Sequence, residues 1–159
     1  MSFDQEISVR SATNLDCERV QDLVFGVLRE YGLAPDPDGT DRDITDIETH
    51  YLKRGGVFEI LENADGNLLG TCGLYPLDDE TIELRKMYFA KELRGRGYGK
   101  KLLERMIETA RALGFRQMHL ETHSALKEAI ALYKKYGFQP TDEEKLTPRC
   151  DHTYFLELN

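Results

Sequence analysis

The sequence predicts an α/β fold: a mixed, mostly antiparallel sheet of six or seven strands with helices on both faces. Three short apolar segments joined by turn residues between positions 57 and 89 are typical of an antiparallel meander. A strand, a helical pattern and a further strand follow between positions 82 and 121, which places two strands parallel. A chain of 159 residues suffices for one domain that buries about 70% of its unfolded surface and is short for two. We therefore expect a single domain over residues 1–159.

The first strand is expected over residues 7–10 and the first helix after Thr13. Thr13 followed by Asp16 is a helix start of the capping-box type, with Asp in place of the usual Glu. Gly32 is the expected C-cap residue, and the prolines and glycine at 35–39 predict a loop. Between these two ends the apolar residues recur at helical spacing, at Val20, Leu23, Val24, Val27, Leu28 and Tyr31.

Residues 57–61, 68–77 and 82–89 are expected to be the strands of the meander. Asp65-Gly66-Asn67 supplies the first hairpin turn, in which glycine adopts a positive φ. Pro76 and the acids that follow it turn the chain into the third strand of this group. These strands should therefore lie side by side in chain order.

The second half of the chain alternates helices and strands. Strand 117–121 carries Met118 and Leu120 on one face and His119 and Glu121 on the other. Short strands are expected at Gly137-Phe138 and over 152–158, and the apolar last strand could lie at a sheet edge and pair with a second copy, giving a possible homodimer. Two helices are predicted from apolar positions, one from Leu103, Met106, Ile107 and Ala110, the other, capped by Ser124, from Leu126, Ala129, Ile130 and Tyr133.

A glycine-rich turn between strand 82–89 and its helix predicts a phosphate site. A helix leaves its first backbone N–H groups without intrahelical partners, and its dipole favours an anion there. Residues 91–111 carry seven Lys or Arg against three Glu in a chain of net charge −8. Backbone and side chains of this segment thus favour the same kind of ligand.

Three kinds of phosphate-binding loop compete for this turn. A Walker A loop requires G-x-x-x-x-G-K-S/T, but Lys101 follows Gly99-Lys100 and Arg94 stands at the first glycine position, so we reject it. A dinucleotide loop requires G-x-G-x-x-G, and the spacing here is G-x-G-x-G, a weak match. Glu121 could serve as its ribose-binding acid, but too little chain follows to complete a doubly wound sheet.

The third kind fits best. Residues 94–99 match Q/R-x-x-G-x-G/A, and the turn thereby resembles the acetyl-CoA pyrophosphate loop of the GNAT superfamily of N-acetyltransferases. The resemblance extends over residues 83–138, with 84–89 similar to the fourth strand of the family and 129–138, AIALYKKYGF, similar to the segment that closes its cofactor cleft. Lys91 stands where many members carry proline. Leu126 stands where many carry an asparagine that helps to hold the pantetheine arm.

The resemblance implies an acetyl-CoA-dependent N-acetyltransferase that moves an acetyl group to a primary amine of a small molecule by direct attack. It implies that the fourth and fifth strands splay and that backbone groups of Met87, Tyr88 and Phe89 hold the pantetheine arm in the gap. One of their N–H groups would face the thioester oxygen, a contact that contributes roughly 3 to 4 kcal/mol in other oxyanion holes. The implied pyrophosphate site consists of Arg94, Gly95, Arg96, Gly97, Tyr98, Gly99 and Lys100.

The resemblance also implies two catalytic side chains. Glu83 matches the fourth-strand carboxylate that acts as base in many members, which is needed because an alkylamine of pKa near 10 is mostly protonated at neutral pH. Glu121 and His119 are the alternative bases, and a solvent-facing strand residue is the alternative role of Glu83. Tyr133 matches the acid beside the coenzyme sulfur. A packing role for Tyr133 and a competing phenol at Tyr136 stay open.

Residues 36–48 carry six acids and one base, and residues 41–52 are expected to form a second, weaker helix. The segment is either a solvated loop or, because the resembled family covers its acceptor site with this region, a rim that attracts a cationic amine. The acids are Asp36, Asp38, Asp41, Asp43, Asp46 and Glu48, and the base is Arg42.

Composition limits the partners. The acidic balance argues against nucleic acid, and no apolar run approaches the roughly 20 residues that span a membrane. The N-terminus lacks the pattern of a leader, so we expect a cytoplasmic protein. We expect no metal, since the histidines at 50, 123 and 152 lack suitable spacing, and buried, reduced thiols at Cys17, Cys72 and Cys150. Two other functions stay open: a protein or peptide N-acetyltransferase, and a non-catalytic sensor that binds acyl-CoA.

Overall fold

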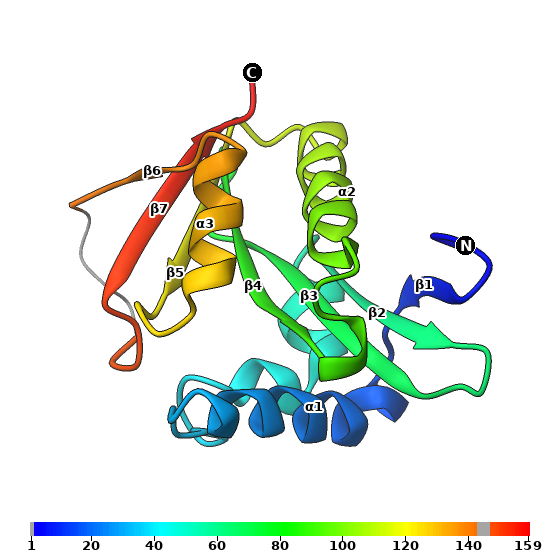
Figure 1. Cartoon of the computed structure of the whole chain (residues 1–159). Coiled ribbons are helices and arrows are strands. Elements are labelled where there is room, and N and C mark those ends of the chain that lie inside the picture. Colours follow the sequence, from blue (N-terminus) through cyan, green and yellow to red (C-terminus); the bar gives the residue numbers. More distant parts are fainter. Residues whose placement is uncertain (1, 143–146) are drawn as a thin grey trace.

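A computed structural model describes residues 2–142 and 147–159. Its seven strands form one sheet in the order β1-β2-β3-β4-β5-β7-β6 (Figure 1). The pairing of β4 with β5 is parallel and every other pairing is antiparallel, which confirms the predicted mixed sheet. The strands are β1 Ile7–Ser11, β2 Val57–Asn63, β3 Leu68–Pro76, β4 Thr81–Phe89, β5 Gln117–Thr122, β6 Gln139–Pro140 and β7 His152–Glu157.

Helices cover both faces of this sheet, as predicted. One core cluster joins Leu84 of β4 to Leu103 and Tyr133 of the helices on one face. A second core cluster joins Phe58 of β2 to Val24 of the helix on the other face. Figure 1 shows α2 and α3 beside each other and α1 crossing near the end of β4. The helices are α1 Cys17–Glu30, α2 Tyr98–Ala112 and α3 Lys127–Lys135, with short 3-10 turns η1 Asn14–Asp16, η2 Arg42–Thr45 and η4 Lys91–Leu93 and a π-helical turn η3 Glu48–Leu52.

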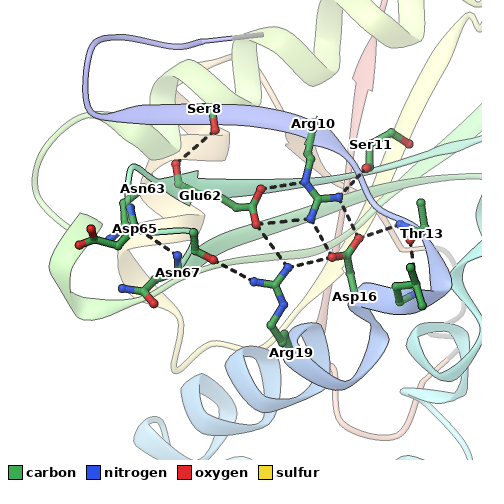
Figure 2. Close-up of polar contacts among 12 residues, drawn as sticks. Ser8, Arg10, Ser11, Thr13, Asp16, Arg19, Glu62, Asn63, Asp65 and Asn67 are labelled. Carbon is green, nitrogen blue, oxygen red and sulfur yellow. Dashed lines mark hydrogen bonds and ion pairs between the residues drawn. The ribbon is translucent and has the colours of Figure 1, made fainter.

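A network of ion pairs connects the start of α1 to β1 and β2 (Figure 2). The predicted capping box is present, because the Asp16 carboxylate accepts the N–H of Thr13 at 2.9 Å and the Thr13 hydroxyl accepts the N–H of Leu15. Asp16 also pairs with Arg10 at 2.8 Å and with Arg19 at 2.9 Å. The network fixes the direction of α1, whose opposite end reaches the cleft described below.

Two predictions on local structure are wrong. Residues 41–52 form no continuous α-helix, because the chain leaves helical geometry at Asp46 between η2 and η3. Ser124 does not cap α3: its N–H and hydroxyl both donate to Asp151, at 2.9 and 2.8 Å, and α3 begins only at Lys127. In the second case the serine hydroxyl donates to a distant carboxylate and does not accept a hydrogen bond from a backbone N–H of the helix.

The predicted edge position of the last strand is also wrong. β7 lies between β5 and β6, although β6 covers it only through the pairs Gln139 with Phe155 and Pro140 with Tyr154. The sixth strand begins at Gln139 instead of Gly137, because Gly137 at φ 93° ends α3. The sheet order thus places β6 and not β7 at this edge, and the homodimer stays a prediction.

Other expectations concern burial. Cys17 and Cys72 are buried as predicted, whereas Cys150 is only half-buried. Over residues 2–142 and 147–159, no helix has the length and apolar character needed to cross a membrane. The cytoplasmic location stays a prediction.

Candidate active site

The strands β4 and β5 separate after three residue pairs. Their parallel register covers Thr81 with Gln117, Ile82 with Met118 and Glu83 with His119, whereas β4 pairs with β3 as far as Phe89. The edge of β4 that faces β5 is therefore not covered by β5 beyond Glu83, although β4 continues to Phe89. The predicted splay is confirmed, and a strand-like guest can bind in the gap.

A bulge changes the course of β4 inside this gap. The β3–β4 register shifts between Thr71 and Gly73, opposite Lys86, which has a φ of 55°. The Thr71 hydroxyl donates to the carbonyl of Lys86 at 2.7 Å and holds the bulge in place. A positive φ at a lysine is strained and persists only where surrounding contacts impose it.

The glycine-rich turn ends at the N-terminus of α2. Gly95 and Gly97 have φ values of 75° and 86°, which a side chain with a Cβ adopts only with strain. Within the described chain, the amides of residues 95–100 donate to no acceptor. The loop therefore presents a row of free N–H groups at a helix N-terminus, which is a site for phosphate oxygens.

Side chains of the loop anchor it to its surroundings. Arg94 donates to the Phe89 carbonyl at 3.0 Å and pairs with Glu30 of α1 at 2.7 Å. The hydroxyl of Tyr98 donates to Asp4 at 2.6 Å. One terminal nitrogen of Arg94 is buried and has no hydrogen-bond partner in the described chain. A buried donor without an acceptor is costly, so this nitrogen fits a site for an anionic ligand.

The loop and the splayed strands border one cleft of about 760 Å³. Arg96 is the one predicted site residue outside the lining, and its guanidinium pairs instead with Glu6 and the Glu92 carbonyl. The predicted residues that line the cleft are Glu83, Met87, Tyr88, Phe89, Arg94, Gly95, Gly97, Tyr98, Gly99, Lys100 and Tyr133.

Glu83 is buried in the cleft wall, with 4% of the residue exposed. Its carboxylate accepts a hydrogen bond from Arg85. Burial raises the pKa of Glu83 above its ordinary value and outweighs the opposing effect of Arg85. A carboxylate with a raised pKa that faces a cleft is suited to accept a proton.

The two alternative bases, His119 and Glu121, are less well placed than Glu83 to accept a proton in the cleft. His119 does not line the cleft, and its Nε2 lies 2.6 Å from Gln117 Oε1. Glu121 does line it, but its carboxylate accepts the N–H of Thr147 at 3.1 Å and the hydroxyl at 3.2 Å.

Tyr133 lies on α3 and is 6% exposed. The centroid of its ring lies 5.6 Å from the ring centroid of Phe138. No hydrogen bond joins its hydroxyl to the described residues, and burial raises its pKa well above the ordinary phenol value. The hydroxyl therefore keeps its proton. Tyr136 does not line the cleft, and its hydroxyl donates to Glu104, which raises its pKa to about 12.

The predicted acidic rim is wrong for its central residues. Asp41 is fully buried. Its two carboxylate oxygens accept hydrogen bonds from Arg149 at 2.7 and 2.8 Å, and it forms an ion pair with Lys86 at 3.3 Å. Asp43 is buried beside Lys86 at 3.2 Å and accepts the hydroxyl of Tyr51. Although burial acts against it, the two cations hold the pKa of Asp41 below its usual range. These acids join three segments of the chain and are not free to attract an amine.

Replacing Asp41 with asparagine is expected to lower the free energy of unfolding by about 2 to 3 kcal/mol, because Arg149 loses its carboxylate partner and Lys86 keeps only Asp43. Urea unfolding followed by circular dichroism measures this. Asp38→Asn is the control, since Asp38 is an exposed acid of the same loop. Equal stability of the two variants would mean that the ion pair contributes nothing.

The sequence interpretation missed three cations in the cleft lining: Arg85, Lys86 and Arg149. The two-residue period of a strand places Arg85 on the face of Glu83, so the pattern contained the signal for it. No pattern indicated the bulge at Lys86. Arg149 lies in the loop before β7, where periodicity carries no information.

The fold and the cleft define a class of protein. A parallel strand pair that splays beside a free row of helix N-terminal amides forms a site for an extended ligand that carries a phosphate. A carboxylate and a phenol suited to proton transfer line the same cleft. No group of three or more His, Cys, Asp or Glu able to hold a metal ion occurs in the described part of the chain.

Comparison with known proteins identifies the family. Residues 22–138 match the model of the acetyltransferase (GNAT) family. The chain is 36% identical to the uncharacterized N-acetyltransferase YjgM of Escherichia coli K12, over 84% of this chain and 83% of that one. The chain therefore belongs to the GNAT acetyltransferase family, and it is an acyltransferase of the GNAT type.

Solved structures show the same fold. A GNAT-family acetyltransferase of Staphylococcus aureus Mu50 superposes with a TM-score of 0.90 at 26% identity, covering 96% of this chain and 99% of that one. The structure of yncA, a putative acetyltransferase from Salmonella typhimurium with its cofactor acetyl-CoA, superposes with a TM-score of 0.74 at 21% identity, covering 96% and 94%.

Proposed function

We propose that this protein transfers the acetyl group of acetyl-CoA to a primary amine of a small molecule by direct attack. The amine nitrogen forms a bond to the thioester carbon, the carbon–sulfur bond breaks, and CoA leaves as the thiol. The observation that carries the proposal is the coincidence, in one cleft, of a splayed β4 edge, a free row of loop amides and the buried carboxylate of Glu83.

The loop fits the coenzyme pyrophosphate. The amides of residues 95–100 supply donors, Lys100 supplies a charge at the cleft, and the unpartnered nitrogen of Arg94 supplies a further donor. Met87, Tyr88 and Phe89 would hold the pantetheine arm through their backbone groups, and one of their N–H groups would stabilise the charge that develops on the thioester oxygen. A neighbour of the same fold, yncA, was solved with acetyl-CoA, which agrees with this assignment.

The base and the acid lie toward opposite faces of the sheet. Leu84 packs in the cluster under α2 and α3 that also contains Tyr133, so the strand alternation directs Glu83 and Arg85 to the α1 face. Glu83 would take the proton of an amine that enters from the α1 face, and Tyr133 would protonate sulfur that leaves toward α3. Burial that raises the pKa of the phenol also raises that of a neighbouring thiol, so the transfer stays feasible.

A small acceptor is supported by the contacts of Arg149, which join two loops across the α1 face of the sheet. Arg149 joins Asp41 and also donates to the Ala34 carbonyl at 3.2 Å, so two loops that line the cleft are tied together. This leaves less room for a polypeptide than an open groove would. A protein or peptide acceptor and a non-catalytic sensor are the alternatives.

The test is an assay of CoA release with acetyl-CoA and a panel of primary amines, with mass spectrometry of the product. Turnover of a small amine supports the proposal. Acetylation confined to peptides would favour the protein acceptor, and binding of acetyl-CoA by calorimetry without turnover of any amine or peptide would favour the sensor.

Replacing Gly97 with valine is expected to raise the Kd for acetyl-CoA at least tenfold, about 1.4 kcal/mol, because a β-branched residue resists a φ of 86° and obstructs the loop. Isothermal titration calorimetry measures the affinity. Gly114→Val is the matched control, because Gly114 has a φ of 91°, open surroundings and no place in the cleft lining. An unchanged Kd in a folded Gly97→Val protein would remove the loop from the coenzyme site.

A further inference from the structure

Arg85 is held in the cleft wall by contacts on one edge and one face of its guanidinium. Its Nε donates to Glu83, and the guanidinium carbon lies 3.7 Å from the ring centroid of Tyr75. Tyr75 packs in turn against the ring of Tyr51, with centroids 5.8 Å apart. The side chain of Arg85 is 25% exposed. Since these contacts fix its plane, the guanidinium is oriented before any ligand binds.

The terminal nitrogens of Arg85 differ from those of the other cations at this end of the cleft. Lys86 is paired with Asp41 and Asp43, and both terminal nitrogens of Arg149 are on Asp41. By contrast, no acceptor for the two terminal nitrogens of Arg85 is found in residues 2–142 and 147–159. Such a fork of N–H groups matches the two oxygens of a carboxylate.

Charge balance at this end of the cleft favours the same ligand. Lys86 and Arg149 pair with Asp41 and Asp43, so Glu83 is the carboxylate that pairs with Arg85. Glu121, which also lines the cleft, accepts hydrogen bonds from Thr147. When Glu83 accepts the proton of the amine, the cluster gains a positive charge and Arg85 loses its counterion. A buried unpaired cation is costly, so an acceptor that brings its own carboxylate lowers the free energy of this step.

From this geometry we propose that the acceptor is zwitterionic, an α-amino acid or a compound that likewise carries an amine and a carboxylate on the same carbon. This rests on the proposed acetyl transfer and names its substrate class. Because Glu83 and Arg85 are in direct contact, the amine that faces Glu83 and the carboxylate that faces Arg85 must be close neighbours in the acceptor. The inference replaces the purely cationic acceptor that the acidic segment had suggested.

The test compares matched acceptors with the wild-type protein. Each of the common α-amino acids is assayed beside its primary amide and its decarboxylated amine, with acetyl-CoA saturating. We expect kcat/KM for the preferred amino acid to exceed that of its amide and of its amine by at least about tenfold, as loss of one charge-assisted contact implies. If amides and simple amines are acetylated as well as the amino acids, the inference fails and the proposed function stands. If acetyl-CoA binds and nothing is acetylated, both fail.

The variant Arg85→Gln assigns the preference to this side chain. It should lower kcat/KM for the amino acid about 100-fold, mostly through KM, and lower that for the amide by a clearly smaller factor, which measures the loss of the hydrogen bond from Arg85 to Glu83. Arg85→Lys keeps the positive charge but lacks the pair of terminal N–H groups. Its kcat/KM for the amino acid should lie between those of the wild type and of Arg85→Gln. Arg54→Gln is the matched control, because Arg54 lies over the same Tyr75 ring at 4.3 Å and outside the cleft lining. Equal losses for amino acid and amide, in variants that keep the wild-type Kd for acetyl-CoA, would overturn the assignment.

Discussion

Replacing Glu83 with glutamine is expected to lower kcat/KM about 10³-fold at neutral pH, within the range for loss of a general base. The acceptor amine is then left protonated, because an alkylamine has a pKa near 10 and no carboxylate remains to take its proton. Glutamine preserves the size of the side chain. Steady-state kinetics with the best amine of the panel measures the loss, and calorimetry checks that acetyl-CoA still binds.

The pH profile gives a second readout for Glu83. The ionised carboxylate is the active form, so kcat/KM should fall as the pH drops through the raised pKa of Glu83, above the ordinary value of 4.5. The Gln variant should lack this limb. Glu121→Gln distinguishes the competing base: if it carries the loss and the limb while Glu83→Gln stays active, Glu121 is the base and Glu83 is a structural partner of Arg85.

Replacing Tyr133 with phenylalanine is expected to lower kcat by about 10² to 10³, with little change in the KM of the acceptor or the Kd of acetyl-CoA. The substitution removes only the hydroxyl, which makes no hydrogen bond to the described residues, and leaves the ring packed beside Phe138. The departing sulfur then leaves as a thiolate, which is less favourable in a buried site.

Tyr136→Phe is the internal control for this prediction. Its hydroxyl bonds to Glu104 outside the cleft lining, so its loss should leave kcat nearly unchanged. If Tyr133→Phe turns over at the wild-type rate while chemistry limits kcat, Tyr133 is a packing residue and the proton comes from water or another group.

The segment from β4 to α2 was predictable because its structure depends on near neighbours. Alternating and helical apolar positions define a strand and a helix, and glycines at 95 and 97 permit the positive φ values of the turn. The same local logic predicted the capping box at Thr13 and the two helix-covered faces. It also placed Glu83 and Tyr133 on elements that now line one cleft.

The sequence predicted how many charged residues a segment carries, but not which of them are buried or paired. The sequence shows six acids over residues 36–48, but not that Asp41 is fully buried on Arg149, a residue 108 positions away. Ser124 likewise bonds to Asp151, 27 positions away, and no helix cap forms there.

The sequence by itself therefore determined the strand–loop–helix unit, because this unit follows from short-range periodicity and backbone preference. The motif in its loop indicated the family, and the resemblance to that family supplied the candidate base and acid. The tertiary structure decided which charges are neutralised and which nitrogens stay available in the cleft. An ion pair forms wherever folding brings opposite charges together in a dry site, and that juxtaposition leaves no trace in the spacing of the residues along the chain.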